Sequence, residues 1–157
     1  MTLPRETVQD YPRPPRLEPV PQRVRIRLGG VEIVDTDRAF RVCETHHAPT
    51  YYIPPTAVIG ARLVPCAGAS FCEWKGRAQY FDVTADGVTA RRAAWAYPTP
   101  SPAFADIADY LAFYPGLMEA CSVDGAPVTP QPGGFYGGWV TPNLDGIVKG
   151  APGTQGW

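Results

Sequence analysis

The order of hydrophobic and polar residues predicts a chain that folds mainly into antiparallel β-strands. Over residues 23–28, apolar side chains alternate with three arginines, which is typical of a strand with one buried face. Gly29-Gly30 follows directly and predicts a two-residue hairpin turn, with a third strand near residues 38–44. The turn fixes the expected facing pairs, which are Leu28–Val31, Ile26–Ile33 and Arg27–Glu32.

A second hairpin is predicted over residues 71–97, with its turn at Asp86-Gly87. This register sets Asp82 against Arg91, and it gives the further pairs Tyr80–Ala93, Ala78–Trp95 and Gly76–Tyr97. On the apolar face, two very small residues then lie opposite two large aromatic ones. The predicted result is a concave space with aromatic walls, which suits either a small ligand or core side chains from a second sheet.

Shorter elements, separated by proline and glycine, are predicted for the rest of the chain. Residues 57–65 are typical of a strand, and residues 121–124 of a last strand. Ser101 is a candidate cap for a short helix with Pro102 at its first position, and Pro115 is expected to end that helix. Its buried side would carry Phe104, Ile107, Leu111 and Tyr114.

The proline and glycine pattern divides the chain into three parts. Residues 1–22 are an extended proline-rich arm, which is either a peptide ligand for an aromatic groove or a segment laid across its own domain. Residues 23–126 form a single β domain. Residues 127–157 are a tail rich in proline, glycine and aromatic side chains, which we expect to pack on the body.

Composition and charge narrow the classes of function. The chain has 157 residues, of which 45% are hydrophobic and 18% charged, and this indicates one globular domain. Its formal net charge of -1 argues against nucleic acid or a membrane surface as a partner. The first ten residues are polar, and no apolar run approaches the ~18 residues of a membrane span. We therefore expect a cytoplasmic protein.

The cysteines fit a reducing compartment. No Cys-x-x-Cys motif occurs among Cys43, Cys66, Cys72 and Cys121, so we expect no zinc ribbon, and no metal or cofactor. Cys66 and Cys72 flank a short predicted loop within reach of each other. A reducing cytosol nevertheless favours free, partly buried thiols.

Candidate chemistry is confined to one cysteine, one lysine and two histidines. In Cys72-x-x-Lys75 an ammonium would stabilise a thiolate, but on a regular strand these two side chains point to opposite faces. A bulge at Gly76 would turn Lys75 inward, and without a bulge Lys75 is a solvated surface residue. His46 and His47 are either acid–base groups or ligands, or loop histidines with ordinary hydrogen bonds.

Several of these motifs follow one another in a specific order. They are Tyr11-Pro-Arg-Pro-Pro, Gly29-Gly30, Asp35-Thr36, His47-x-Pro49-Thr-Tyr51-Tyr52-x-Pro54, Cys72-x-x-Lys75-Gly76-x-Ala78-x-Tyr80, Ala94-Trp95-x-Tyr97-Pro98-x-Pro100, Ala112-Phe113-Tyr114 and Val123-Asp124-Gly125. In this order, over about residues 11–126, the chain resembles the domain of unknown function 427 family, an uncharacterised bacterial family. That family often has Ser where this chain has Ala96, and the tail beyond residue 130 lies outside the shared core.

The resemblance implies a mainly β fold in which two antiparallel sheets and one short helix surround a pocket, similar to the β-tent or Mss4-like group. That group includes methionine sulfoxide reductases of the B type and the drug-binding domain of cereblon, and many members hold zinc through paired Cys-x-x-Cys motifs. Zinc is not carried over to this chain, which lacks those motifs. The positions carried over are His47, Tyr51, Tyr52, Cys72, Lys75, Gly76, Tyr80, Trp95 and Tyr97.

The family is sometimes labelled nucleotidyltransferase, and the residues argue against that chemistry. Such enzymes need a glycine turn followed by paired acidic residues on a strand, which hold magnesium for phosphoryl transfer. Gly29-Gly30 and Asp35-x-Asp37 match this pattern superficially. The carboxylates follow the turn too closely, however, for an intervening phosphate-binding helix. We interpret both segments as turns.

Three hypotheses for the function follow. The leading one is a domain that binds a small flat or cationic ligand, whose polar groups His47 and Lys75 would orient. Its aromatic contacts would come from Tyr51, Tyr52, Tyr80, Trp95 and Tyr97. The second is an enzyme with Cys72 as nucleophile, assisted by Lys75 or His47. The third is an interaction module, in which the arm or the tail contacts a partner or a second copy.

Overall fold

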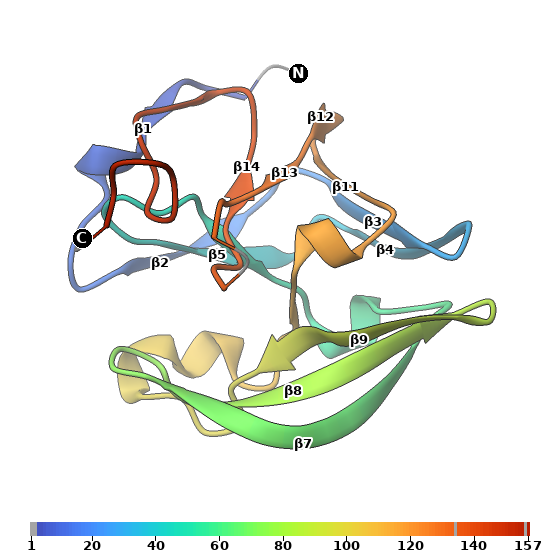
Figure 1. The fold of residues 1–157 in the computed structure, drawn as a ribbon. Coiled ribbons are helices and arrows are strands. Elements are labelled where there is room, and N and C mark those ends of the chain that lie inside the picture. The colour runs from blue at the N-terminus through green and yellow to red at the C-terminus, as the bar shows by residue number, and fades with distance from the viewer. Residues whose placement is uncertain (1–2, 134, 156) are drawn as a thin grey trace.

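The computed structural model describes residues 3–133, 135–155 and 157, and it is mainly β, as predicted. Two four-stranded sheets and one three-stranded sheet make up most of the fold (Figure 1). The first sheet has the order β10 (Ala112–Phe113), β9 (Val88–Ala96), β8 (Gly76–Ala85) and β7 (Arg62–Cys72). The second has the order β12 (Ala126–Pro127), β11 (Ala120–Val123), β3 (Val24–Leu28) and β4 (Val31–Thr36). Neighbouring strands in both sheets are antiparallel.

The three-stranded sheet includes part of the N-terminal segment. Its order is β2 (Arg16–Val20), β5 (Ala39–Cys43) and β6 (Thr50–Tyr52), so β2 is an edge strand that begins within residues 1–22. Pro19 is tolerated there because an edge strand has one side without ladder hydrogen bonds. Two short pairs complete the strands: parallel β1 (Glu6–Thr7) with β15 (Leu144–Asp145), and antiparallel β13 (Thr129–Pro130) with β14 (Trp139–Val140).

The first predicted hairpin is present, with one error in its register. Gly29 and Gly30 form the turn with φ of 63° and 76°, the left-handed conformation that glycine adopts without steric cost. A one-residue bulge then places Val34, not Ile33, opposite Ile26. Both Ile33 and Val34 are fully buried, so alternation alone did not reveal the extra residue.

The second hairpin also turns at Asp86-Gly87, but its register shifts beyond the turn. Three residues, 91–93, lie opposite the single residue Asp82, so Tyr80 faces Trp95 and not Ala93. At this irregularity the Asp82 carboxylate accepts the backbone N–H of Arg92 at 2.8 Å, and the predicted pair with the Arg91 side chain is not formed. A slip of two residues preserves the faces of the strand. Tyr80 and Trp95 therefore still share one face, as predicted.

The prediction of one continuous strand over residues 71–83 is wrong. Strand β7 extends over Arg62–Cys72, and residues 73–75 form a tight turn that leads into β8. Gly76 opens β8 with φ of 104°, and Cys72 pairs with Gly76 across the turn. The strand predicted at residues 57–65 accordingly begins only at Arg62, because a short helix and an irregular segment come first.

The short helix after Pro100 is a 3-10 helix and ends earlier than predicted. Helix η3 spans Pro102–Ile107, with Phe104 and Ile107 buried, and Ser101 makes no side-chain capping bond. Leu111 instead forms a bridge to Ile53, and β10 follows it. Pro115 does not end a helix but begins η4 (Pro115–Leu117). The other 3-10 helices are η1 (Val8–Asp10) and η2 (Pro55–Ala57). The last predicted strand, β11, is followed by four short ones.

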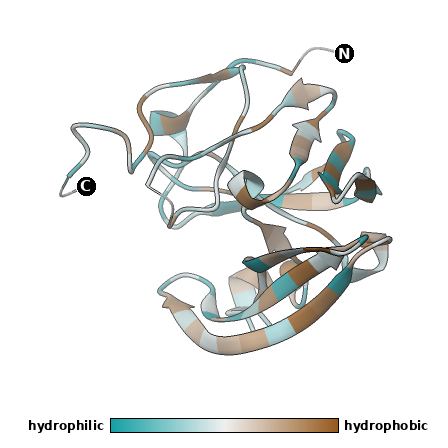
Figure 2. Ribbon diagram, turned by 45° about the vertical axis from the view of Figure 1, so that its right-hand side comes forward, coloured by the Kyte–Doolittle hydropathy of each residue, from teal (hydrophilic) through white to brown (hydrophobic). Residues whose placement is uncertain are grey.

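Two hydrophobic clusters lie on opposite sides of strand β9. Ala94 and Ala96 belong to the larger cluster, whereas Trp95 and Tyr97 belong to the second. The prediction that one face of this sheet is exposed to solvent is therefore wrong at the end of β9 and just beyond it, where residues 93–97 are all buried. Figure 2 shows hydrophobic and hydrophilic positions in succession along the β7–β9 sheet. No helix of the described residues is long and apolar enough to cross a membrane.

The C-terminal tail is part of the packed structure. Trp139 is 1% exposed within the larger cluster, and its indole N–H donates to the carbonyl of Phe113 at 3.1 Å. Its backbone N–H donates to the carbonyl of Pro49 at 2.8 Å. Burying a tryptophan contributes several kcal/mol, so the tail contributes to the stability of the β domain.

Candidate functional site

A cavity of about 280 Å³ lies where the aromatic face of β8 and β9 approaches β5, β6 and the tail. Its walls combine aromatic rings with a few polar side chains, the usual composition of a small-molecule site. Its lining includes His47, Tyr52, Cys72, Lys75, Trp95 and Tyr136. Tyr80 and Tyr97 also line it, so all of the predicted site residues except Tyr51 meet at this cavity.

The aromatic walls come from strands that the sheets bring together. The Trp95 ring contacts Tyr114 and lies near Tyr80, with centroid distances of 4.6 Å and 6.4 Å. Tyr52 from β6 contacts Tyr97, with ring centroids 6.4 Å apart. Val42, Phe104 and Ile107 pack against the same face, so core side chains fill part of the predicted space and leave the cavity beside them.

Burial keeps the phenol groups of Tyr52, Tyr97 and Tyr114 neutral at physiological pH. Burial raises the pKa of Tyr52 and of Tyr97 far above the usual value near 10. Burial also raises the pKa of Tyr114 to about 12. These phenols are therefore suited to donate or accept hydrogen bonds rather than to act as phenolate bases.

Lys75 points into the cavity because of the turn at residues 73–75. Its side chain is 9% exposed, and its ammonium lies 5.7 Å from the ring centroid of Tyr97 and 5.8 Å from that of Phe104. The positive φ of Gly76 next to it allows this turn, which replaces the bulge that the sequence analysis considered at Gly76. Cys72, on the other side of the turn, is a half-buried free thiol that lines the same cavity.

His47 is held in one orientation by a buried glutamine of the tail. The side-chain amide N–H of Gln131 lies 3.2 Å from Nδ1 of His47, and it also donates to the carbonyl of Lys149 at 2.9 Å. Burial, with the positive charges of Lys149, Arg13 and Lys75, lowers the pKa of His47 to about 4. His47 is therefore a neutral imidazole near pH 7.

Tyr51 lies outside the cavity. It is next to Tyr52 on strand β6, so its side chain points to the other face of the strand. There its ring packs on Trp139, with centroids 5.0 Å apart, and the tyrosine is 4% exposed. Tyr51 is accordingly a core residue of the larger cluster, and the sequence-based site set is corrected at this position.

Comparison with known proteins identifies the family. A family described as "Domain of unknown function (DUF427)", also named NTP_transf_9, matches residues 16–124. The chain belongs to this DUF427 family. No curated protein matches it significantly. The matched segment contains the aromatic wall, Lys75 and His47.

The part of this DUF427 protein beyond residue 124 completes the cavity, and sequence analysis did not identify it. Tyr136 contacts His47, with ring centroids 5.3 Å apart, and Gly137 lies against the Trp95 ring. Gln131 is 2% exposed although it is polar. A glutamine in a proline–glycine segment gives no sequence signal for burial, so only the fold assigns it to the site.

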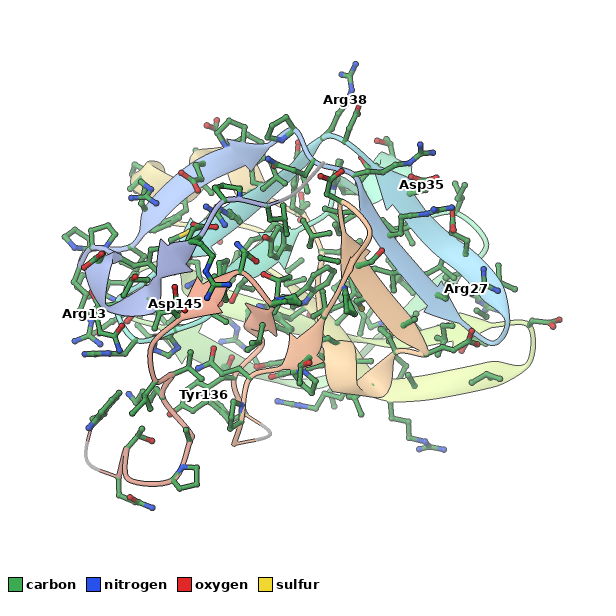
Figure 3. The ribbon with its side chains drawn as sticks, turned by 90° about the horizontal axis from the view of Figure 1, so that it is seen from above. Arg13, Arg27, Asp35, Arg38, Tyr136 and Asp145 are labelled. Carbon is green, nitrogen blue, oxygen red and sulfur yellow. The ribbon has the colours of Figure 1, made fainter. Side chains whose placement is uncertain are left out.

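The features that the nucleotidyltransferase label would need lie elsewhere in the DUF427 fold. Asp35 is bound by Arg23 at 2.5 Å, which holds the pKa of Asp35 below its usual range. Figure 3 shows Asp35 and Arg27 on the β3–β4 hairpin, on the opposite side of the molecule from Tyr136. Across residues 3–133 and 135–155, no group of three or more His, Cys, Asp or Glu side chains is placed to share a metal ion.

A second cavity of about 630 Å³ adjoins the first and shares Tyr80, Tyr114 and Tyr136 with it. The guanidinium of Arg92 covers the Tyr80 ring there, with its Cζ 3.9 Å from the ring centroid. This cavity is larger, but it lacks the convergent lysine and histidine. We therefore place the candidate site in the smaller cavity, where the polar groups converge.

Proposed function

We propose that this DUF427 protein binds a small flat molecule in the cavity between Tyr52, Trp95 and Tyr97. The observation that carries the proposal is the convergence of aromatic rings with Lys75 and His47 around one cavity of about 280 Å³. Aromatic side chains that stack on a planar ligand contribute to its binding affinity, and a few polar groups fix its orientation. At this volume the ligand is a molecule with one or two rings.

The cationic ligand considered from the sequence is disfavoured by Lys75. Its ammonium is directed to the same cavity and already lies near the rings of Tyr97 and Phe104. A second cation there would meet like-charge repulsion in a region of low dielectric constant. A flat ligand without positive charge is therefore the form of the hypothesis that the geometry supports.

A thermal-shift screen of metabolites tests the proposal. A ligand of the wild type should lose its shift in Trp95→Ala, because the ring that covers the cavity is gone. Trp95→Phe keeps a smaller ring and should retain part of the shift even where Trp95→Ala folds poorly. Trp157→Ala is the matched control, because Trp157 is 44% exposed and lies outside the cavity lining. Equal shifts in all four proteins would refute a site at this cavity.

A cysteine enzyme is the second candidate, and one observation favours it. Cys72 and Lys75 line the same cavity, although a regular strand would have separated them. The hypothesis requires Cys72 to be alkylated much faster than Cys66, which is also half-buried. Equal rates at these two cysteines would exclude an activated nucleophile. A role for the arm or the tail in oligomerisation stays a prediction.

The proposal also includes the cellular compartment of the protein. All four cysteines are free thiols, and Cys66 and Cys72 lie along one strand rather than facing each other. Free thiols favour a reducing environment, so we propose a cytoplasmic protein. Fractionation of the native source, with this chain found in a membrane or secreted fraction, would contradict it.

A further inference from the structure

We infer that the ligand of this cavity carries an oxyanion, a carboxylate or a phosphate, which Lys75 and His47 bind while its ring lies against the aromatic wall. The inference rests on the proposed binding function and deepens it by naming the chemical class of the ligand. Its central observation is a lysine, nine-tenths buried, whose ammonium faces the cavity without an acidic partner among the described residues.

Lys75 is an exception among the buried basic residues. Its side chain is nine-tenths buried, yet no ion pair or hydrogen bond reaches its ammonium within the described part of the chain. Arg41 shows the contrast, because its guanidinium is bound by Glu6 at 2.7 Å and Glu18 at 2.6 Å. The ammonium opens to the cavity, where two ring faces give it only a weak electrostatic partner. A ligand oxyanion would supply the missing counter-charge.

The charged side chains that line the cavity are Lys75, Glu44 and Glu73. Lys149, Arg13 and Lys75 all act on His47 as positive charges. Glu44 is the nearest acid, with its carboxylate 3.9 Å from Nε2 of His47, but Arg13 pairs with it at 3.6 Å. Glu73 also lines the cavity but is exposed to solvent. With Glu44 paired and Glu73 exposed, Lys75 is the lining charge left without a partner, and it favours an anion over a cation.

Gln131 fixes the tautomer of His47, a cavity-lining residue whose Nε2 lies 3.9 Å from the Glu44 carboxylate. The backbone N–H of Ala48 donates to the Gln131 side-chain oxygen at 3.0 Å, so the amide nitrogen faces His47 and Lys149. That nitrogen donates, and Nδ1 of His47 must therefore accept. The proton of the neutral imidazole is then on Nε2. A donor at Nε2 complements an oxyanion, whereas it would not bind a second donor.

Matched pairs of planar probes test the inference on the full chain. Each pair is an aromatic carboxylic acid and its primary amide, with benzoate and benzamide as the simplest, and phenyl phosphate and benzylamine complete the set. Binding is measured by ligand-observed NMR and calorimetry at neutral pH. We expect the acids to bind about tenfold or more tightly than the amides, the typical effect of a charge-assisted hydrogen bond. The tighter of benzoate and phenyl phosphate identifies the oxyanion.

Two variants of Lys75 separate charge from shape. Lys75→Met should weaken the binding of the acid more than that of the amide, so that the preference for the acid is lost, whereas Lys75→Arg should keep that preference. Should Lys75→Met fold poorly, the comparison of acid and amide in the wild type and in Lys75→Arg still decides. Equal binding of acid and amide, or tighter binding of benzylamine, would overturn the inference and leave the binding function intact. No binding of any probe would overturn both.

Discussion

Gly137 should not tolerate even one additional methyl group. A Cβ at this position would lie 2.0 Å from Cη2 and 2.8 Å from Cζ2 of Trp95, far inside van der Waals contact. The backbone of Gly137 is not in the left-handed region, so alanine adds no conformational strain of its own. The substitution Gly137→Ala therefore tests one contact, that between the tail and the ring which covers the cavity.

The cost depends on whether the Trp95 ring can move away. Tyr114 and Tyr80 both lie near this ring, with centroid distances of 4.6 Å and 6.4 Å, and Trp95 is 7% exposed. The ring is thus confined, and the tail or the cavity wall must shift instead. Overpacking of this kind typically costs about 1–3 kcal/mol. For a chain of this length each kcal/mol lowers the melting temperature by roughly 2–4 °C.

Thermal and urea unfolding of Gly137→Ala measure this loss, with Gly116→Ala as the control. A Cβ at Gly116 would meet Pro130 at 3.5 Å, which is an ordinary contact, and its backbone is likewise free of a positive φ. We expect the control to match the wild type or exceed its stability slightly, since alanine restricts the unfolded chain. Equal stability of the two variants would refute the packing of the tail on Trp95.

Three further predictions follow from the buried polar groups. The pKa of His47 is about 4 when folded and near 6.5 when unfolded, so the unfolded chain binds the extra proton. The free energy of unfolding should therefore fall by up to about 3 kcal/mol between pH 6.5 and 4. Urea titrations should show a flatter dependence on pH for His47→Gln, and an unchanged dependence would contradict the lowered pKa of His47. Gln131→Leu leaves three hydrogen-bonding groups unpaired and should lower the free energy of unfolding in urea by about 2–4 kcal/mol. The tail should also be cleaved faster by proteases, and wild-type resistance to proteolysis would contradict this role of Gln131. Burial raises the pKa of Cys43 and of Cys121 to about 12. After iodoacetamide treatment at neutral pH, mass spectrometry should therefore find both unmodified while Cys72 reacts. Modification of all three cysteines at one rate would contradict the fold.

The cavity residues show which features of the site local sequence patterns can predict. Tyr80, Trp95 and Tyr97 were assigned to one face from strand alternation, and this assignment held although the register slipped by two residues. The prediction that Tyr51 lines the cavity is wrong because adjacent residues of a strand point to opposite faces, and the sequence does not show which face meets the cavity. Gln131 was missed because its burial depends on partners that are 84 and 18 residues distant in the chain.

The sequence by itself determined the mainly β fold, the two glycine-containing hairpin turns and the shared face of the large aromatic side chains. These features depend on neighbouring residues, through the conformations that glycine permits and the period-two alternation of a strand. Only the tertiary structure decided that residues 73–75 turn and bring Lys75 inward, and that Gln131 and Tyr136 of the tail reach His47. Contacts between distant segments arise from packing of the whole chain, which no local pattern encodes.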